Sequence, residues 1–159
     1  MANRKNALIQ AAIDKKINPK YILNAVAMES GGNPNAISSS GAIGLTQIVG
    51  KTAQHLKIRD RFDPNHNIQG AIDLAKENIH YLHVHNLPIN EENMYMMHQL
   101  GASTAPVVIK AARDGKDLSD ATRKSIGKNV GNGSKTARGY IDANMQHLNN
   151  QYKVVFPDN

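Results

Sequence analysis

The sequence predicts a single, mostly α-helical domain with one small irregular or β lobe after its second helix. Apolar residues recur at helical spacing through most of the 159 residues, a length that suits one domain with its own core. Residues 31–50 break this pattern, because they are rich in glycine, serine and asparagine. We therefore expect one domain over residues 1–159, with helices before and after this loop region.

The helices are expected in chain order between glycine, proline and asparagine residues. Asn18 before Pro19 is a helix-start signal, because asparagine caps a helix and proline fits its first position. Gly101 is expected to close a later helix. A turn is expected around Pro64, and a short strand pair over residues 43–48. The predicted helices cover residues 3–16, 18–30, 51–56, 67–85, 90–100, 104–113, 118–126 and 134–151.

Glu29 is the leading candidate for a catalytic acid. It continues the apolar face that Ala25 and Val26 begin, and Gly31 then ends the helix. Partial burial and the negative end of the helix dipole both favour the protonated form of its carboxyl group, which is the form that a general acid needs. The alternative is a glutamate at a helix end that reaches into water.

The segment after Glu29 points to a neutral, hydroxyl-rich or amide-rich ligand such as a sugar. Its glycines allow close approach of the backbone, and its Ser, Thr, Asn and Gln side chains offer uncharged hydrogen-bonding groups. No Asp or Glu lies between Gly31 and Arg59, so a second catalytic carboxylate would have to come from Asp60, Asp63 or beyond. The pattern favours a one-acid mechanism over a two-carboxylate one, and a plain surface loop is the alternative.

The composition excludes several classes of function. Cysteine is absent, so there is neither a disulfide nor a thiol nucleophile. The net charge of +6 favours an anionic partner such as a cell-wall polymer or envelope surface, whereas the lack of Trp argues against nucleic acid. No segment is apolar for long enough to be a signal peptide or a stable membrane insertion. The spacing of His80, His83 and His85 does not fit a metal site, so none is expected.

The stretch from Glu29 to Ala53 resembles the signature of soluble-lytic-transglycosylase-type (SLT) domains. It reads ESGGNPNAISSSGAIGLTQIVGKTA, where the family pattern is ES…P.A.S..GA.GL.Q followed by TA. The segments 62–68 and 137–141 also resemble later motifs of the family. The resemblance implies the lysozyme-like fold, related to goose-type lysozyme, over about residues 5–150.

Two departures from the family pattern stand out. Thr46 replaces the usual Met before Gln47, a change expected to alter contacts to the sugar. His98-Gln99-Leu100-Gly101 stands where the family has Tyr-Asn-Ala-Gly, which is similar to phage-encoded members. His98 thus takes the place of the tyrosine that makes a stacking contact in the family, while Gln99 keeps a hydrogen-bonding group.

The resemblance implies a lytic transglycosylase of peptidoglycan glycan strands. Glu29 would act as general acid and then base on the bond between N-acetylmuramic acid and N-acetylglucosamine, with formation of a 1,6-anhydro ring. Ser30 and Gln47 would orient the acid and the sugar, Gln99 would bind a substituent, and Tyr140 would lie beside the reacting centre. No cofactor or metal is expected. The predicted substrate-binding residues are Ser30, Ser38, Gly44, Leu45, Gln47, His98, Gln99 and Tyr140.

Two other functions remain open at this point. One is a lysozyme-type muramidase in which Asp60 or Asp63 positions water, and the other is a non-catalytic wall-binding or structural virion module. We expect a monomer, made in a host cytoplasm without a signal peptide. It would reach the wall as an endolysin released through a membrane pore, or with the virion.

Overall fold

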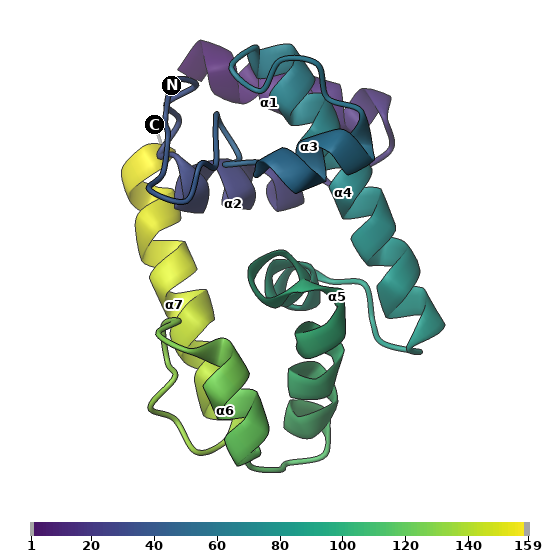
Figure 1. The fold of residues 1–159 in the computed structure, drawn as a ribbon, viewed down its shortest axis with the longest axis vertical. Helices are drawn as coiled ribbons and strands as arrows, with labels where there is room; N and C mark the ends of the chain where they lie inside the picture. The colour runs from purple at the N-terminus through teal and green to yellow at the C-terminus, as the bar shows by residue number, and fades with distance from the viewer. Residues whose placement is uncertain (1, 158–159) are drawn as a thin grey trace. The chain divides into compact units, whose positions relative to one another are not determined.

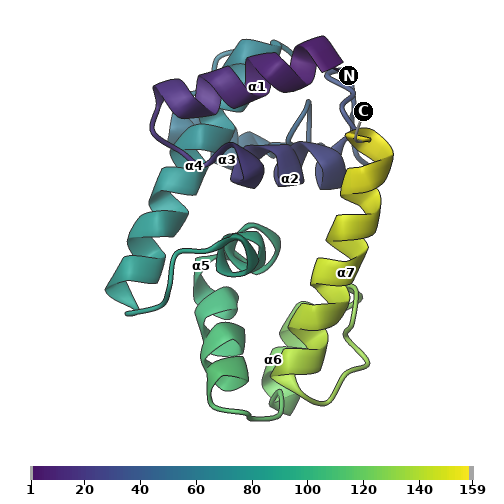
Figure 2. The ribbon, with the colours of Figure 1, turned by 180° about the vertical axis from the view of Figure 1, so that it is seen from behind.

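The computed structural model describes residues 2–157, and it confirms the mostly helical prediction (Figures 1 and 2). Within that range β structure is limited to isolated antiparallel bridges that pair Ile37 with Ile43, Ile43 with Ile48, and Asp117 with Thr136. The helices are α1 (Ala2–Asp14), α2 (Pro19–Glu29), α3 (Gly50–Leu56), α4 (Pro64–Val84), α5 (Glu91–Arg113), α6 (Asp120–Ile126) and α7 (Ala137–Val155).

The described chain forms two compact units. Unit 1 contains the residues up to Glu77 together with those from Gln151 onwards, and unit 2 contains Asn78–Asn150. Helices α4 and α7 each contribute to both units, because the boundaries fall within them. No helix in the described part of the chain is both long enough and apolar enough to cross a membrane.

Helix α2 is the central element of unit 1. The Asn18 side chain accepts a hydrogen bond of 2.9 Å from the Lys20 amide, and Pro19 occupies the first turn, as the start signal predicts. Six consecutive residues, 22–27, are buried. Gly31 and Gly32 follow with φ of +62° and +94°, so the helix ends at Glu29.

Helix α4 begins at Pro64, so the predicted turn around Pro64 ends at residue 63 and the helix starts three residues before the predicted residue 67. The Asp63 carboxylate accepts hydrogen bonds from the amides of Asn65 at 2.8 Å and His66 at 3.2 Å. Proline needs no amide partner at a first helical position, so Asp63 and Pro64 together start the helix.

Helix α7 ends at Val155, four residues beyond its predicted end, and its last residues belong to unit 1. Phe156 is buried, and its ring lies 5.2 Å from that of Tyr152. The Lys20 ammonium of α2 lies 3.7 Å from the Tyr152 ring centre, a cation–π contact. Helix α1 packs on α2 in the same unit. The C-terminal end of the chain is therefore part of the unit that contains Glu29.

Unit 2 is built from the end of α4, α5, α6 and most of α7. Gly101 interrupts α5 with φ of 81° and ψ of 172°, which confirms the predicted break after residue 100 even though one helix spans Glu91–Arg113. Helix α6 packs against α5, and both views draw it beside α7 (Figures 1 and 2). Ser119 caps α6 by accepting a hydrogen bond of 3.1 Å from the Thr122 amide.

Candidate active site

Glu29 is the last residue of α2, and its side chain is half-buried. The amides of Ser30 and Gly31 both bond to the Val26 carbonyl at 3.2 and 3.1 Å, so the backbone turns sharply after the acid. The carboxyl group therefore lies at the C-terminal end of α2, next to the loop that follows it. The helix and its two glycines fix the position that the sequence predicts for a general acid.

Ser30 connects the end of α2 to the loop that precedes α3. Its hydroxyl donates a hydrogen bond of 2.7 Å to the Leu45 carbonyl and accepts one of 3.1 Å from the Gly32 amide. The hydroxyl predicted to orient the acid and the sugar is thus engaged in joining two backbone segments.

Gln47 has a similar role inside the loop. Its side-chain nitrogen donates to the carbonyls of Ala36 at 3.0 Å and Gly44 at 2.9 Å, so both amide hydrogens are used within the chain. The side-chain oxygen is the group that can receive a hydrogen bond from a ligand. Gln47 also has φ of +53°, an uncommon conformation for a residue with a side chain.

The other predicted loop residues mainly shape the backbone. The Ser38 hydroxyl accepts from the Ala42 amide at 3.0 Å and lies 3.0 Å from the Ser40 hydroxyl. Gly44 has φ of +87°, and a Cβ atom there would lie 2.3 Å from the Asn67 amide nitrogen. Leu45 is fully buried, so its side chain lies in the core of unit 1.

Asn67 and Arg61 support this loop, and the sequence reading did not single them out for that role. The fully buried Asn67 bonds to the backbone of Ile43 and Thr46, and the Arg61 guanidinium donates to the Gly41 and Ile48 carbonyls at 3.1 and 2.8 Å. The local sequence pattern predicts Asn67 only as the first residue of a helix, and it does not indicate a buried side-chain amide.

The three predicted residues of unit 2 lie on α5 and α7. His98 and Gln99 are half-buried in the turn before Gly101, and the Gln99 amide donates to the Tyr95 hydroxyl. Tyr140 is fully buried, and its hydroxyl has no hydrogen-bond partner within the described residues. Burial raises the pKa of the Tyr140 hydroxyl, so this group stays protonated at neutral pH.

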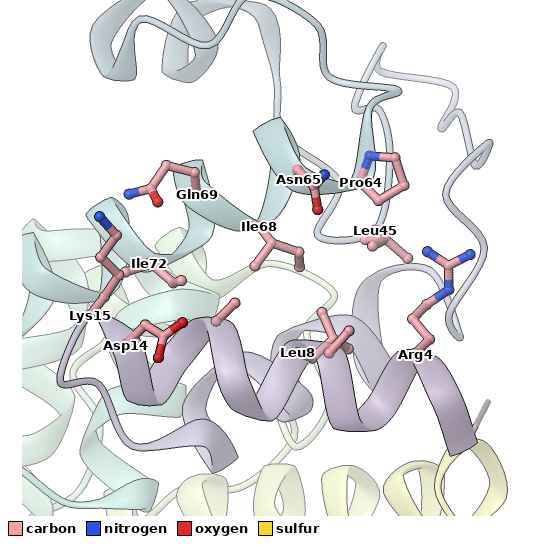
Figure 3. Close-up of a pocket in the computed structure, with 12 residues that line it drawn as sticks. Arg4, Leu8, Asp14, Lys15, Leu45, Pro64, Asn65, Ile68, Gln69 and Ile72 are labelled. Atoms are coloured by element: carbon pink, nitrogen blue, oxygen red, sulfur yellow. The ribbon is translucent and has the colours of Figure 1, made fainter.

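A cavity of about 320 Å³ opens between α1 and the first half of α4 (Figure 3). Leu8, Ile68 and Ile72 form its apolar lining, while Arg4 and Lys15 lie towards its two ends. Leu45 also lines it, but Glu29, Ser30 and Gln47 do not. Of these four predicted site residues, the cavity is therefore lined by Leu45 alone, whose side chain lies in the core of unit 1.

The structure also bears on two other possibilities, an aspartate that positions water and a metal site. The carboxylates of Asp60 and Asp63 each accept backbone hydrogen bonds, at 3.0 Å from the Phe62 amide and 2.8 Å from the Asn65 amide, so both serve as caps. In the part of the chain that the structure covers, no three His, Asp or Glu side chains are grouped as a metal site would require.

The mostly helical fold, with Glu29 as the last residue of α2, agrees with the lysozyme-like fold that the sequence resemblance implies. The family model described as Transglycosylase SLT domain matches residues 6–94, more than half of the 159 residues. The chain therefore belongs to the transglycosylase SLT domain family, a family of enzymes. The match covers Glu29 and the loop up to Gln47, whereas His98, Gln99 and Tyr140 lie beyond it.

A relative from a bacteriophage also carries the name of a transglycosylase. A protein of Enterobacteria phage PRD1 named Transglycosylase is 36% identical over 69 residues, which make up 43% of this chain and 26% of that protein. The chain thus aligns with about a quarter of the length of that curated relative.

Proposed function

We propose that this protein is a lytic transglycosylase that cleaves the β-1,4 bond between N-acetylmuramic acid and N-acetylglucosamine in peptidoglycan. The observation that carries the proposal is Glu29, a half-buried acid at the end of α2, next to a loop without any carboxylate from Gly31 to Arg59. Membership of the transglycosylase family supports the same class of reaction.

In the proposed reaction, Glu29 first acts as a general acid. It gives its proton to the glycosidic oxygen, the bond from this oxygen to C1 of the muramic residue breaks, and N-acetylglucosamine leaves. The acetamido oxygen of the muramic residue attacks C1 and takes the place of a carboxylate nucleophile. This substrate-assisted step suits a site with one acid.

Glu29 then acts as a general base. Its carboxylate removes the proton from the C6 hydroxyl of the muramic residue, and O6 attacks C1 as the acetamido group leaves. The product is a 1,6-anhydro ring, water is not consumed, and Glu29 regains its proton. The loop of unit 1 would bind substrate through backbone groups and the Gln47 side-chain oxygen, since the Ser30 hydroxyl and both Gln47 amide hydrogens are bonded within the chain.

The hydrolytic alternative requires a carboxylate that positions water. Asp60 and Asp63 were the nearest candidates along the chain, and both use an oxygen to cap backbone amides in the turn and first helical residues before Asn67. A carboxylate that accepts hydrogen bonds from nearby backbone amides is less available to position water, so neither residue is well suited to this role. We therefore favour the transglycosylase over the muramidase.

The resemblance to the family assigns three residues of unit 2 to substrate binding. His98 and Gln99 are half-buried in the helical turn before the break at Gly101. Tyr140 is assigned next to the reacting centre by the resemblance of residues 137–141 to the late family motif. The phage relative supports a role in wall lysis during a phage life cycle, either as an endolysin or as an enzyme delivered with the virion.

Mass spectrometry of the products released from purified peptidoglycan tests the proposal. The expected products end in 1,6-anhydro-N-acetylmuramic acid. Reducing ends in their place would favour the muramidase, and binding to intact sacculi without any release would favour a wall-binding module. The Glu29→Gln variant, treated in the same way, is expected to release no anhydro products.

A further inference from the structure

We propose that Asn67 and Thr46 form a positioning pair that sets the shape of loop 43–48, and through it the binding of the glycan next to Glu29. The inference rests on the proposed function, because the loop is assigned to the glycan site there. Neither residue is proposed to touch the substrate.

Asn67 uses all of the hydrogen-bonding capacity of its side chain. Its oxygen accepts from the Thr46 amide at 3.0 Å and from the Thr46 hydroxyl at 2.6 Å. Its nitrogen donates to the carbonyls of Ile43 and Arg61, both at 3.0 Å. Since the side chain is fully buried, each of these groups would be costly to leave unpaired. Four bonds from one amide tie the loop and residue 61 to α4.

Thr46 is the part of this pair that departs from the family pattern. A methionine at that position has no hydroxyl, whereas the Thr46 hydroxyl makes the shortest of the four contacts to Asn67. Thr46 is also only 5% exposed, so its side chain points into unit 1. The Thr46 side chain therefore acts on the loop, and the expected change in contacts to the sugar would be transmitted through the loop backbone.

The anchored segment is continuous with the residue that follows Glu29. The Ser30 hydroxyl holds the Leu45 carbonyl at 2.7 Å, one residue before Thr46. Gly44 fits against Asn67 and Arg61 so closely that an added Cβ atom would lie within 2.4 Å of each. A shift of the loop at Thr46 would therefore move the contact between Leu45 and the end of α2.

The test compares Thr46→Val, which removes the hydroxyl and keeps the branched shape, with Thr46→Ser, which keeps the hydroxyl. Thr52→Val on α3 is the matched control, because Thr52 is half-buried and has no side-chain hydrogen bond among the described contacts. Activity on purified peptidoglycan is measured well below the unfolding temperature of each variant, and exchange of the loop amides is followed by NMR.

Thr46→Val is expected to lower kcat/KM by about three- to tenfold, the effect of losing one neutral hydrogen bond. The loss should appear mainly as a higher KM, with faster exchange of the Thr46 amide. Thr46→Ser should restore both values, and Thr52→Val should change neither. Asn67→Asp, which loses both donors, should reduce kcat/KM by more than Thr46→Val does.

Two results would overturn the proposal. Thr46→Val with unchanged kcat/KM and a lower unfolding temperature would mean that the pair only stabilises the fold. Unchanged exchange of the Thr46 amide would mean that the hydroxyl does not hold the loop. If the wild type does not cleave peptidoglycan, the proposed function fails by itself, and the exchange measurement still decides the role of the pair.

Discussion

At the end of α2, neighbouring residues have different roles. Glu29 presents a half-buried carboxyl group, whereas the Ser30 hydroxyl is bonded to the Leu45 carbonyl and the Gly32 amide. The proposed chemistry depends on Glu29, whereas Ser30 joins the end of α2 to the loop that contains Leu45. Substitutions at the two positions should have different consequences.

Glu29→Gln should lower kcat on peptidoglycan by about 10²–10⁴-fold, because the amide can neither give nor take the proton. The unfolding temperature should stay close to that of the wild type, since the two side chains have almost the same size. Glu77→Gln is the matched control. Glu77 makes a partly exposed ion pair with His55 at 2.7 Å, and the loss of such a pair has a small effect. Wild-type activity in Glu29→Gln would remove the acid from the mechanism.

Gly44→Ala should lower the free energy of unfolding by about 2–4 kcal/mol, from the positive φ together with the crowding against Asn67 and Arg61. Gly50→Ala is the control, because it begins α3 with open space around the position of its Cβ atom. Chemical denaturation of both variants gives the comparison. Equal stabilities for the two would contradict the close packing described at Gly44.

The position of Glu29 at a helix end could be predicted from the sequence better than the contacts around it. Glu29 could be found because a carboxylate on an apolar helix face before two glycines is visible in local spacing. The hydrogen bonds from Ser30 and Gln47 to distant carbonyls could not be predicted. They join residues that are 15 and 11 positions apart in the sequence, so they depend on the tertiary fold. The buried role of Asn67 is a tertiary feature for the same reason.

The presence of the helices could be predicted from the sequence more reliably than the residues at which they begin and end. The break at Gly101 was read correctly, since glycine at a positive φ ends a regular helix. The start of α4 was missed because proline marks both turns and first helical positions, and only the Asp63 cap distinguishes them. The end of α7 was missed because Phe156 is buried by tertiary packing.

The last turn of α7 offers a test of how unit 1 is held together. Phe156→Ala should lower the free energy of unfolding by about 3–5 kcal/mol, because it removes a buried aromatic ring that packs on Tyr152. Val154→Ala is the control, since Val154 is 74% exposed, and it should change stability by less than about 0.5 kcal/mol. A small effect of Phe156→Ala in thermal and urea unfolding would mean that this turn does not stabilise the unit.

At the scale of the whole chain, the net charge of +6 should contribute to binding an anionic cell wall. Because exposed charges are screened by salt, the affinity of the inactive Glu29→Gln variant for purified sacculi should fall as the ionic strength rises from about 0.05 to 0.5 M. Sedimentation of the protein with sacculi measures this. Affinity that does not change with salt would assign binding to the neutral glycan contacts alone.

We propose that one acid cleaves the glycan without water as a reactant. Digestion of purified peptidoglycan in water enriched in the heavy oxygen isotope distinguishes this reaction from hydrolysis, with Glu29→Gln as the control. The expected anhydromuramic products contain no heavy oxygen, because the C6 hydroxyl of the sugar supplies the oxygen that bonds to C1. Reducing muramic ends that carry the heavy isotope at C1, absent from the Glu29→Gln digest, would instead identify a hydrolase.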